Sequence, residues 1–545
     1  MRKGVAEGDS ILPKRSATRA KRRIARWAIA GMIGFLGAWG TLSAEPISSL
    51  TELRAQRQQA AARQRRVIFN NDGNEPVYLC KTTSPEELLS FRTTPLAGSH
   101  VDAIFYCTWS SGFGMFTHFT KVGQIFTTRE GRFTNNCMPE FIEKRIDPLQ
   151  VLVEFAHSNR MELFWSFRMN DTHDGSPTDY GPIMFRANKL KQAHPEWLIG
   201  SINKRPKYGV WSAADFGVPD IRDLAFRYCE EVCQNYDVDG VELDFFRHAF
   251  FFKSSGRGEP CTEAELSQMT ELIQRIRKMT EDLGRKRNRP ILLAVRVPDS
   301  VEYCRFIGLD LENWLKGNLL DLLVVAGYTQ LNPWAYSANL GHKYGVKVYP
   351  SLDESRVKND LARELRADPA TYRGRALNVW SAGADGVYMF NYFDAQSSLW
   401  RELGNPKDLA KLARNYFASI RGVGSVQVPH QKFINVPTLN PAKPLVISPG
   451  NSTRVGFVHG EKAVDEASRS AMLRLQFDNL DMSKDLTLTL DRNTLPSGKI
   501  NDGWIDFKLT NQLSTSGNCL LEIKRPASQK GKLSLLDLYV AVSPR

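Results

Sequence analysis

The chain has 545 residues, long enough for two or three domains, although a single barrel can occupy more than half of such a length. Hydrophobic residues make up 42% and charged residues 24%, which is typical of a folded globular protein and excludes a disordered or collagen-like chain. The net charge is +13, but residues 1–44 hold nine Lys and Arg against two acidic residues, so more than half of the excess lies there. The remaining charge is too mild to indicate nucleic-acid binding.

The first 44 residues have the three parts of a secretory signal. A basic run from Lys21 to Arg26 precedes an apolar stretch over residues 27–42, and small residues follow, ending at Ala44. We expect cleavage near Ala44 and export to the periplasm, the cell envelope or the medium, by a general or a twin-arginine route. The alternative is an uncleaved N-terminal anchor, although the apolar stretch is slightly short for a membrane span. The chain would then contact a membrane only through this segment.

Residues 45–66 are polar and rich in Arg and Gln, which is typical of a linker or a short solvated helix. After them, strand and helix patterns alternate. Eight strands are predicted at residues 67–71, 101–109, 161–170, 238–244, 291–297, 320–330, 346–353 and 386–393. Helices are predicted at residues 139–158, 220–234 and 263–283, the last capped by Thr262, with a closing helix at 407–420.

This alternation predicts a (β/α)8 barrel over residues 67–422, with enlarged loops. A doubly wound open sheet is the competing fold. No glycine-rich phosphate loop follows the first strand, which argues against nucleotide binding, and we expect no cofactor.

Helical patterns stop near Gly422, and residues 430–545 show short alternating runs separated by Gly, Pro, Asn and Ser. These runs predict a small antiparallel β-sandwich, reached through a Pro-rich linker at residues 436–449. Trp504 is the only tryptophan of this region, so a structural appendage is favoured over a carbohydrate-binding module.

The fourth predicted strand carries the strongest functional signal. Its apolar residues alternate with acidic ones, so that Glu242 and Asp244 share one face and Asp244 ends the strand. Because burying an unpaired charge is costly, these acids must face a polar cavity or lie next to cations. We expect an open, solvent-reached pit at the C-terminal end of the barrel; the alternative is a ring of ion pairs at the strand ends.

Strand parity predicts which side chains point into the barrel with these acids. Arg168 and Arg296 should lie on the strands that flank the acidic strand, and Asp353 should lie across the barrel. Two guanidiniums beside Glu242 and Asp244 would favour the ionised forms of both acids. That environment suits a nucleophile or a cation-stabilising carboxylate better than a general acid.

Glycoside hydrolysis needs two carboxyl groups, one to protonate the leaving oxygen and one to attack the sugar or activate water. Asp244 is best placed for attack, with Glu242 as its partner or as a buried member of an ion pair. Asp353 is the first choice for the acid because its parity points inward. The other candidates for the acid are Asp171, Asp174, Asp299 and Glu354.

Residues expected to bind the substrate lie on the strand ends or in the loops after them. Arginines, a histidine and an aspartate can bind sugar hydroxyls, and aromatic rings in loops can stack on sugars, although such rings are as often part of the core. The expected substrate-binding residues are Trp109, Arg168, Asp171, Arg247, His248, Arg296, Tyr328, Trp334 and Asn391.

No metal site is expected. Residues 171–174 have metal-ligand residue types but no predictive spacing, and a hydrogen-bonding loop over the substrate is favoured. Cys229 and Cys233 lie four residues apart on a predicted helix with no further ligand nearby, which favours helix packing over zinc.

Residues 239–247, Asp-Gly-Val-Glu-Leu-Asp-Phe-Phe-Arg, resemble the Asp-Gly-(apolar)-His-Leu-Asp-Tyr-(apolar)-Arg signature of the glycosyl hydrolase-like family 10 domain. Residues 386–392 are similar to the closing strand of that family, and the resemblance covers residues 66–420. It implies an exported bacterial barrel protein that cleaves glycans, with Asp244 and Arg247 at family positions. Glu242 stands where the family tends to have His, and the Tyr-Pro after the Arg is missing, so the family's substrate preference does not carry over.

The leading hypothesis is therefore an exported glycoside hydrolase that acts on a poly- or oligosaccharide. A glycan-binding barrel protein without catalysis is the second hypothesis, because no second carboxylate is clearly identified. The third is a structural envelope protein held by an uncleaved N-terminal helix, which would require a plugged barrel mouth.

Overall fold

The protein was analysed as a computed structural model, which describes residues 47, 49–421, 429–461, 469–510 and 513–544. All eight predicted barrel strands form, and they close into one parallel barrel in the order β1-β10-β9-β8-β7-β6-β5-β2. The predicted (β/α)8 barrel is thus confirmed, and the open sheet is excluded. The strands are β1 (Val67–Asn71), β2 (Val101–Tyr106), β5 (Glu162–Arg168), β6 (Gly240–Asp244), β7 (Leu292–Val297), β8 (Leu322–Val325), β9 (Lys347–Leu352) and β10 (Val387–Met389).

Period-two alternation along these strands separates two apolar layers. One set of side chains packs under the surrounding helices in the main core. The other set fills the barrel interior, so the barrel is a packed core and not a pore. The interior cluster contains Ile68, Ala103, Phe105, Phe164, Leu292, Ala294, Leu322, Val324, Tyr349, Tyr388 and Phe390.

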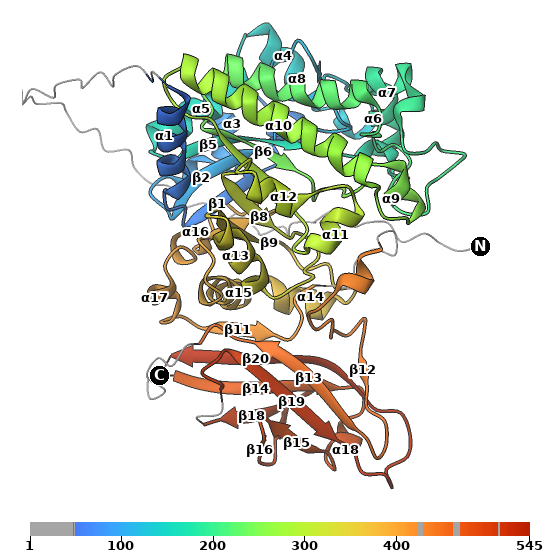
Figure 1. Cartoon of the computed structure of the whole chain (residues 1–545). Coiled ribbons are helices and arrows are strands. Elements are labelled where there is room, and N and C mark those ends of the chain that lie inside the picture. The colour runs from blue at the N-terminus through green and yellow to red at the C-terminus, as the bar shows by residue number, and fades with distance from the viewer. Residues whose placement is uncertain (1–46, 48, 422–428, 462–468, 511–512, 545) are drawn as a thin grey trace, which may run out of the picture.

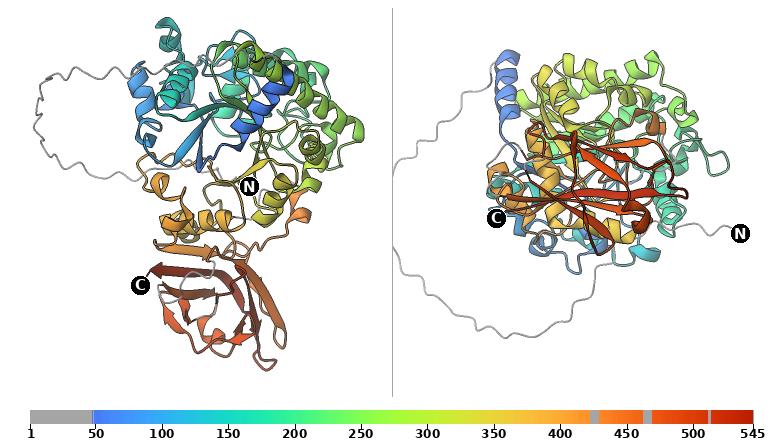
Figure 2. Two further views of the ribbon diagram at one scale, coloured as in Figure 1. Left: turned by 60° about the vertical axis from the view of Figure 1, so that its left-hand side comes forward. Right: turned by 90° about the horizontal axis from the view of Figure 1, so that it is seen from below.

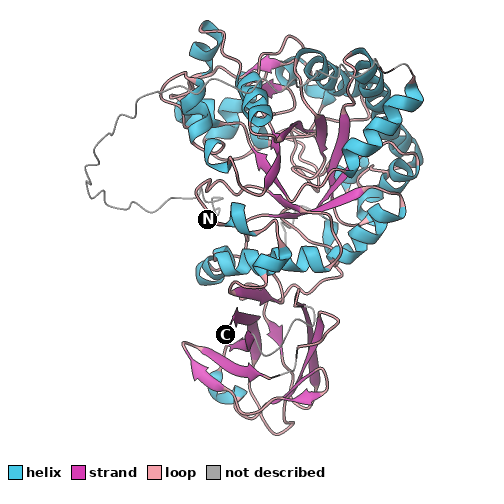
Figure 3. Ribbon diagram, turned by 90° about the vertical axis from the view of Figure 1, so that its left-hand side faces the viewer, coloured by secondary structure: helices cyan, strands magenta, loops and turns pink. Residues whose placement is uncertain are grey.

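Helices surround the strands, as Figure 3 shows. The long helix α10 (Glu263–Lys286) begins with a capping box formed by Thr262 and Glu265, so the predicted cap is confirmed. The other barrel helices are α2 (Glu75–Tyr78), α3 (Pro85–Ser90), α4 (Met138–Glu143), α5 (Pro148–Ser158), α6 (Tyr180–Ala187), α7 (Lys189–Ala193), α8 (Pro219–Asn235), α9 (Lys253–Arg257), α11 (Val301–Phe306), α12 (Leu311–Lys316), α13 (Trp334–Lys343), α14 (Asp360–Ala367), α15 (Pro369–Ser381), α16 (Leu399–Glu402) and α17 (Pro406–Leu409). A two-stranded sheet of β3 (Met115–Phe116) and β4 (Gln124–Ile125) extends the loop after β2.

The segment before the barrel forms the helix α1 (Leu50–Ala62), but this helix is not merely solvated as expected. Leu53 and Arg57 are buried, and the Arg57 guanidinium donates a hydrogen bond of 2.9 Å to Glu281 of α10. Just after α1, the fully buried Arg65 forms an ion pair of 2.6 Å with Glu162 at the start of β5. This segment is therefore bound to the barrel.

The predicted C-terminal β-sandwich is confirmed and lies below the barrel in Figure 1. One antiparallel sheet has the order β11-β20-β14-β18-β17, with β12 also paired to β20, and the other has the order β13-β19-β15-β16. A continuous apolar core fills the space between them. The elements are β11 (Arg414–Phe417), β12 (Leu445–Val446), β13 (Ser452–Val458), β14 (Arg469–Phe477), α18 (Leu480–Ser483), β15 (Thr487–Leu490), β16 (Asn493–Thr494), β17 (Lys499–Asn501), β18 (Trp504–Leu509), β19 (Asn518–Lys524) and β20 (Ser534–Pro544).

The predicted closing helix at residues 407–420 is wrong. Only α17 (Pro406–Leu409) is helical, and β11 pairs with β20 of the sandwich. The sandwich sheet thus begins at Arg414, before residue 430. In the left view of Figure 2 the sandwich lies below the barrel domain, against one end of it.

Within the described residues, no helix combines the length and the hydropathy that a membrane span requires. The predicted signal at residues 1–44 lies outside these residues. All eight cysteines are free in the structure, and Cys229 and Cys233 are buried on α8, where they contribute to packing.

Candidate active site

Three charged residues form a row across the C-terminal ends of neighbouring strands. Register pairs Arg168 of β5 with Asp244 of β6, and Asp244 with Arg296 of β7. One layer deeper, the same pairing aligns Ser166 with Glu242. The parity prediction for these strands is thus confirmed, because a period of two leaves each side chain only one of two faces.

Asp244 is held by charge and by the backbone. Its carboxylate forms an ion pair with Arg296 through two hydrogen bonds of 3.0 and 2.6 Å. It also accepts backbone N–H bonds from Phe246 and Arg247 at 2.9 and 3.1 Å. The residue is 3% exposed, and Arg296 is fully buried. Two backbone N–H groups of the loop after β6 therefore hydrogen-bond to this carboxylate and help to hold it in place.

Glu242 lies in a different environment. One of its oxygens accepts hydrogen bonds from Ser166 at 2.5 Å and from Tyr388 at 3.0 Å, while the other has no partner among the described residues. Burial, together with the charge of Asp244, raises the pKa of Glu242 to about 7. The expectation that flanking guanidiniums keep Glu242 ionised is therefore wrong, because burial outweighs the nearby Arg296.

The expected open pit is also wrong. Glu242 is 0% exposed and Asp244 is 3% exposed, so solvent does not reach the acidic pair in this structure. The strands hold both side chains inward, as predicted, but neighbouring side chains close over them.

Arg168 forms a second ion-pair group in the mouth, with carboxylates that do not belong to β6. Its guanidinium donates to Asp72, after β1, at 2.5 Å and to Asp171, after β5, at 3.1 Å. Burial opposes ionisation of Asp72, but Arg168, Arg247 and Arg92 lower its pKa to about 2. Asp72 and Asp171 are thus ionised structural partners of Arg168.

The loop after β2 fixes this second group. Four residues of this loop have positive φ angles, between 34° and 61°, which residues other than Gly rarely adopt: Thr108, Trp109, Ser110 and Phe113. The Trp109 carbonyl accepts a bond from the Arg168 guanidinium, and the next residues, Ser111 and Gly112, donate to Asp171. Strained backbone is retained here where it positions the charged groups of the mouth.

His173 lies at the rim of the mouth. Its Nδ1 is 2.7 Å from Asp171, and its side chain is 27% exposed. His248 lies beside it, with ring centroids 5.1 Å apart. Burial lowers the pKa of His248 well below its ordinary value, so this ring is neutral. His173 is therefore a partly exposed ring that a buried carboxylate holds in place.

Asp171, His173 and His248 have ligand atoms close enough together to hold a metal ion. However, Asp171 already accepts hydrogen bonds from Arg168, Ser111, Gly112 and His173. The Arg247 guanidinium also lies 3.5 Å from His173 Nε2. Two neighbouring guanidiniums oppose a bound cation, and a hydrogen-bonded loop fits these contacts better.

A group of three hydrogen-bonded side chains lies next to His173: Arg247, Tyr328 and Asn391. Arg247 donates to the Tyr328 hydroxyl at 2.7 Å and to the Asn391 side-chain oxygen at 3.4 Å. Asn391 also donates to the Tyr328 hydroxyl, and all three residues are partly exposed. The structure thus brings together three of the predicted substrate-binding residues.

Asp353, the first choice for the acid, does not lie in an accessible site. It is 0% exposed and accepts hydrogen bonds from Arg375 of α15 and from Arg421 at the end of the first sandwich segment. Two guanidiniums favour its ionised form, which is opposite to what a proton donor requires. The partners of Asp353 indicate a structural role.

The two predicted stacking tryptophans are buried. Trp109 is 4% exposed and packs against Phe126, with ring centroids 4.1 Å apart. Trp334 is 9% exposed and belongs to the main core. Neither presents a free ring face to a sugar, and apolar packing explains both positions.

The remaining candidates for the acid also have structural partners. Asp174 forms an ion pair of 2.8 Å with Lys191. Asp299 accepts backbone bonds from Leu331 and Asn332, and burial raises its pKa to about 6. Glu354 is exposed and lies 3.8 Å from Arg356.

Asp72 and Arg356 of the mouth were not predicted, and His173 was predicted only as part of the loop at residues 171–174. Asp72 and Arg356 both stand in loops after barrel strands, so the rule that working residues follow strand ends could have found them. The contact that brings Arg356 to the site, 3.3 Å from the centre of the Tyr328 ring, could not be read from the sequence.

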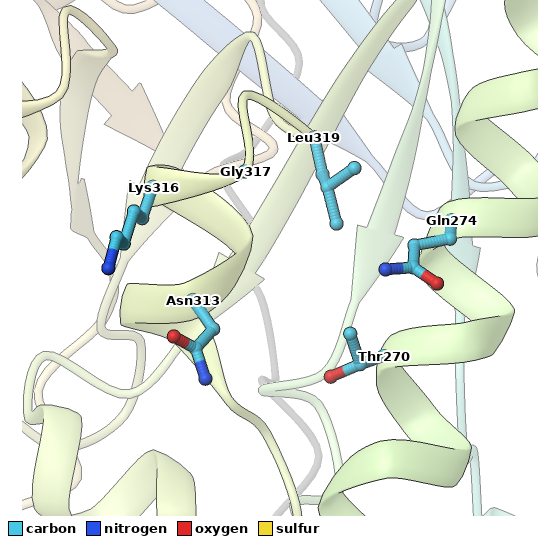
Figure 4. A pocket seen from close by; sticks show the side chains of 6 residues that line it. All are labelled: Thr270, Gln274, Asn313, Lys316, Gly317 and Leu319. Carbon is cyan, nitrogen blue, oxygen red and sulfur yellow. The ribbon is translucent and has the colours of Figure 1, made fainter.

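A pocket of about 520 Å³ lies elsewhere, between α10 and α12 (Figure 4). Its lining residues are Thr270, Gln274, Asn313, Lys316, Gly317 and Leu319. Lys316 is the only titratable side chain among them, and none belongs to a strand end.

No protein-family model matches the chain, and no curated protein matches its sequence. Solved structures that resemble it include a cycloisomaltooligosaccharide glucanotransferase from Paenibacillus sp., with 12% identity and a TM-score of 0.34 over 88% of this chain and 57% of that enzyme. The alpha-L-fucosidase isoenzyme 2 from Paenibacillus thiaminolyticus has 14% identity and a TM-score of 0.40 over 65% of this chain and 51% of its own.

A glycoside hydrolase family 18 N-acetylglucosaminidase from Paenibacillus barengoltzii has 14% identity and a TM-score of 0.34, covering 63% of this chain and 99% of that enzyme. The chain spans only 57% and 51% of the lengths of the first two enzymes. At these identities and TM-scores the likeness concerns the fold alone, and no inference about activity rests on it.

Proposed function

We propose that the protein hydrolyses glycosidic bonds of a poly- or oligosaccharide at the mouth of the barrel. The observation that supports this is the contrast between two acids on one face of β6. Asp244 is paired with Arg296, whereas burial and the charge of Asp244 raise the pKa of Glu242 to about 7. Two neighbouring carboxyl groups in different environments, one bound to a guanidinium and one with a raised pKa, are what this reaction needs. Asp244 is the attacking or cation-stabilising group in this proposal, and Glu242 is the proton donor.

Hydrolysis at this pair requires the mouth to open, because the two acids are 3% and 0% exposed. The loop after β6 is the segment that must shift, since the backbone N–H groups of Phe246 and Arg247 bind Asp244 directly. Closure over a reacting group is common in enzymes that exclude water from the reaction.

Two features of the sequence support the finer parts of the proposal. The likeness of residues 239–247 to glycosyl hydrolase-like family 10 places Asp244 and Arg247 at signature positions. The basic and apolar parts of residues 1–44 support export from the cell, where polymeric glycans are found.

The second candidate function is glycan binding without cleavage. The low exposure of both acids favours it, because binding needs only the partly exposed residues of the rim. Arg247, Tyr328 and Asn391 would then contact the glycan, and the acids would stabilise the strand ends.

Incubation of the purified full-length protein with a panel of glycans tests both functions through the appearance of new reducing ends. Hydrolysis is expected for at least one glycan, with kcat/KM lowered at least about a thousandfold in Asp244→Asn. Since Asp244 also pairs with Arg296, each variant is first checked for cooperative thermal unfolding, and azide should restore part of the activity of Asp244→Ala. Binding without new reducing ends would support the second function, and a panel that is neither bound nor cleaved would refute both.

A further inference from the structure

Arg247 differs from the other two arginines of the mouth in its partners. Arg168 and Arg296 each form a close ion pair, with N–O distances of 2.5 and 2.6 Å. Arg247 contacts the Tyr328 hydroxyl, the Asn391 side-chain oxygen and His173 Nε2 at 2.7, 3.4 and 3.5 Å. None of these partners is a carboxylate, and among the described residues no carboxylate forms an ion pair with Arg247. The Arg247 guanidinium also lies over the Tyr328 and Phe390 rings, so its position is fixed while its charge has no carboxylate in direct contact.

A second guanidinium lies at the same place. Arg356 lies over the Tyr328 ring at 3.3 Å from its centre, and the Arg247 guanidinium carbon is 5.7 Å from the same centre. The two cations are therefore no farther apart than the sum of these distances. Among the residues that the structure describes, the carboxylate that pairs with Arg356 is Glu354, at 3.8 Å, and both of these side chains are about half exposed. Like charges held around one ring repel each other unless an anion lies between them.

The carboxylates of the mouth compensate this charge only from a distance. Asp72 is close enough for Arg247 to lower its pKa, but the contacts of Asp72 are to Arg168. Asp244 is occupied by Arg296, and Asp171 by Arg168 and His173. The rim around Tyr328 thus holds two guanidiniums and one exposed carboxylate, Glu354, while Asp72, Asp171 and Asp244 are buried.

We propose that Arg247, supported by Arg356, binds an anionic group of the glycan, a uronate carboxylate or a sulfate ester. The inference rests on the proposed function and names the substrate class of that same site. A guanidinium presents a planar pair of N–H donors that matches a carboxylate or sulfate in a bidentate manner. Tyr328 and Phe390, with ring centres 5.1 Å apart, supply an aromatic surface beside it for the apolar face of a sugar ring.

Calorimetric titration of the full-length protein tests this with matched ligands. The ligands are trimers of galacturonate, glucuronate and mannuronate, the methyl ester of each, a sulfated galactose oligosaccharide and a neutral cello-oligosaccharide. We expect at least one acidic trimer to bind at least tenfold more tightly than its own methyl ester, which has the same sugar ring without the charge. Stronger binding of the sulfated oligosaccharide with the same arginine dependence would identify sulfate as the anion.

Three variants complete the test. Arg247→Gln is expected to reduce the preference for the charged ligand to less than threefold, and Arg356→Gln to reduce it by a smaller factor. Arg275→Gln removes an arginine of α10 that pairs with Asp223 and should keep the preference unchanged. The inference is overturned if every acid binds no better than its ester and the sulfated oligosaccharide binds no better than the neutral one, or if the preference survives Arg247→Gln. Binding or cleavage of a neutral glycan would then leave the proposed function standing. If no glycan is bound or cleaved, both proposals fall.

Discussion

Glu242 is a buried carboxyl group with one unpartnered oxygen, and its protonation should therefore affect stability. Its pKa is raised to about 7 in the folded protein, mainly by burial, whereas in the unfolded chain it should be close to the ordinary value. At pH values between these two pKa values, the folded state binds more protons than the unfolded state, so stability falls as pH rises. At about 1.4 kcal/mol per pKa unit, the loss amounts to about 3 kcal/mol by pH 8.

Glu242→Gln removes this dependence because glutamine has nearly the same shape and no charge. We expect the difference in free energy of unfolding, variant minus wild type, to increase by about 3 kcal/mol between pH 4.5 and pH 8. Urea unfolding at several pH values, followed by fluorescence, measures the difference. Parallel pH dependences in the two proteins would show that Glu242 titrates as an ordinary glutamate.

The Asp244–Arg296 pair gives a second prediction for single residues. Both side chains are almost fully buried, so removing one leaves the other charge without compensation. Arg296→Met should cost about 3–5 kcal/mol of stability, and adding Asp244→Asn should recover part of it. Arg275→Met, on the exposed surface of α10, is the control and should leave the unfolding midpoint unchanged. Without recovery in the double variant, another interaction would have to explain the loss.

Parity along each strand predicted Arg168, Asp244 and Arg296 in the mouth because the period of a strand is two. Parity could not predict which charges would meet. Arg168 bonds Asp72, which is 96 residues earlier in the chain, and Asp353 bonds Arg421, which is 68 residues later. These partners depend on how distant elements pack, and they changed Asp353 from an expected acid into a structural residue.

At the scale of the element, β6 has to fit tightly between β5 and β7. A Cβ added at Gly240 would lie 2.3 Å from the Phe164 ring and 2.7 Å from the Leu292 carbonyl. Gly240→Ala should therefore destabilise the barrel by at least about 1–3 kcal/mol, because the ring and the backbone of the next strand both have to move. Urea or thermal unfolding measures the loss.

The control for Gly240 is another glycine in a strand. At Gly456 of β13, a Cβ would meet only the Cys519 carbonyl, at 3.8 Å, which is an ordinary contact. Gly456→Ala should leave stability almost unchanged. Equal effects of the two substitutions would show that the space around Gly240 does not limit the packing of β6.

The bounds of helices and strands could be predicted where a residue pattern repeats over many positions. They were wrong where pairing with a distant strand determines the structure. The capped start of α10 and all eight barrel strands followed from local patterns. Residues 414–417 instead continue a helical pattern, yet they pair with β20 and bury Tyr416 and Phe417. Pairing with a strand more than 100 residues later overrides local preference in such a short run.

At the scale of the molecule, the sandwich is docked on the barrel by close packing and buried charge. Helix α15 of the barrel approaches β11 so closely that a Cβ at Gly374 would lie 2.2 Å from the Asn415 carbonyl. Arg421, just after the first sandwich strand, binds Asp353 at the end of β9. The sandwich therefore supports the strand end that the sequence had assigned to catalysis.

A buried ion pair also links the two domains, between Arg366 in α14 and Asp537 in β20, at 2.8 Å and with side chains 0% and 1% exposed. Asp537→Asn leaves the Arg366 charge buried without a carboxylate, so stability should fall by about 3–5 kcal/mol. The effect should appear as a lower thermal midpoint, with the sandwich separating from the barrel before the barrel unfolds. Asp481→Asn, whose pair with Lys484 lies on the surface, is the control and should leave the midpoint unchanged. If Asp537→Asn unfolds in one transition at the wild-type midpoint, docking does not depend on this pair, and the packing of α15 on β11 is sufficient.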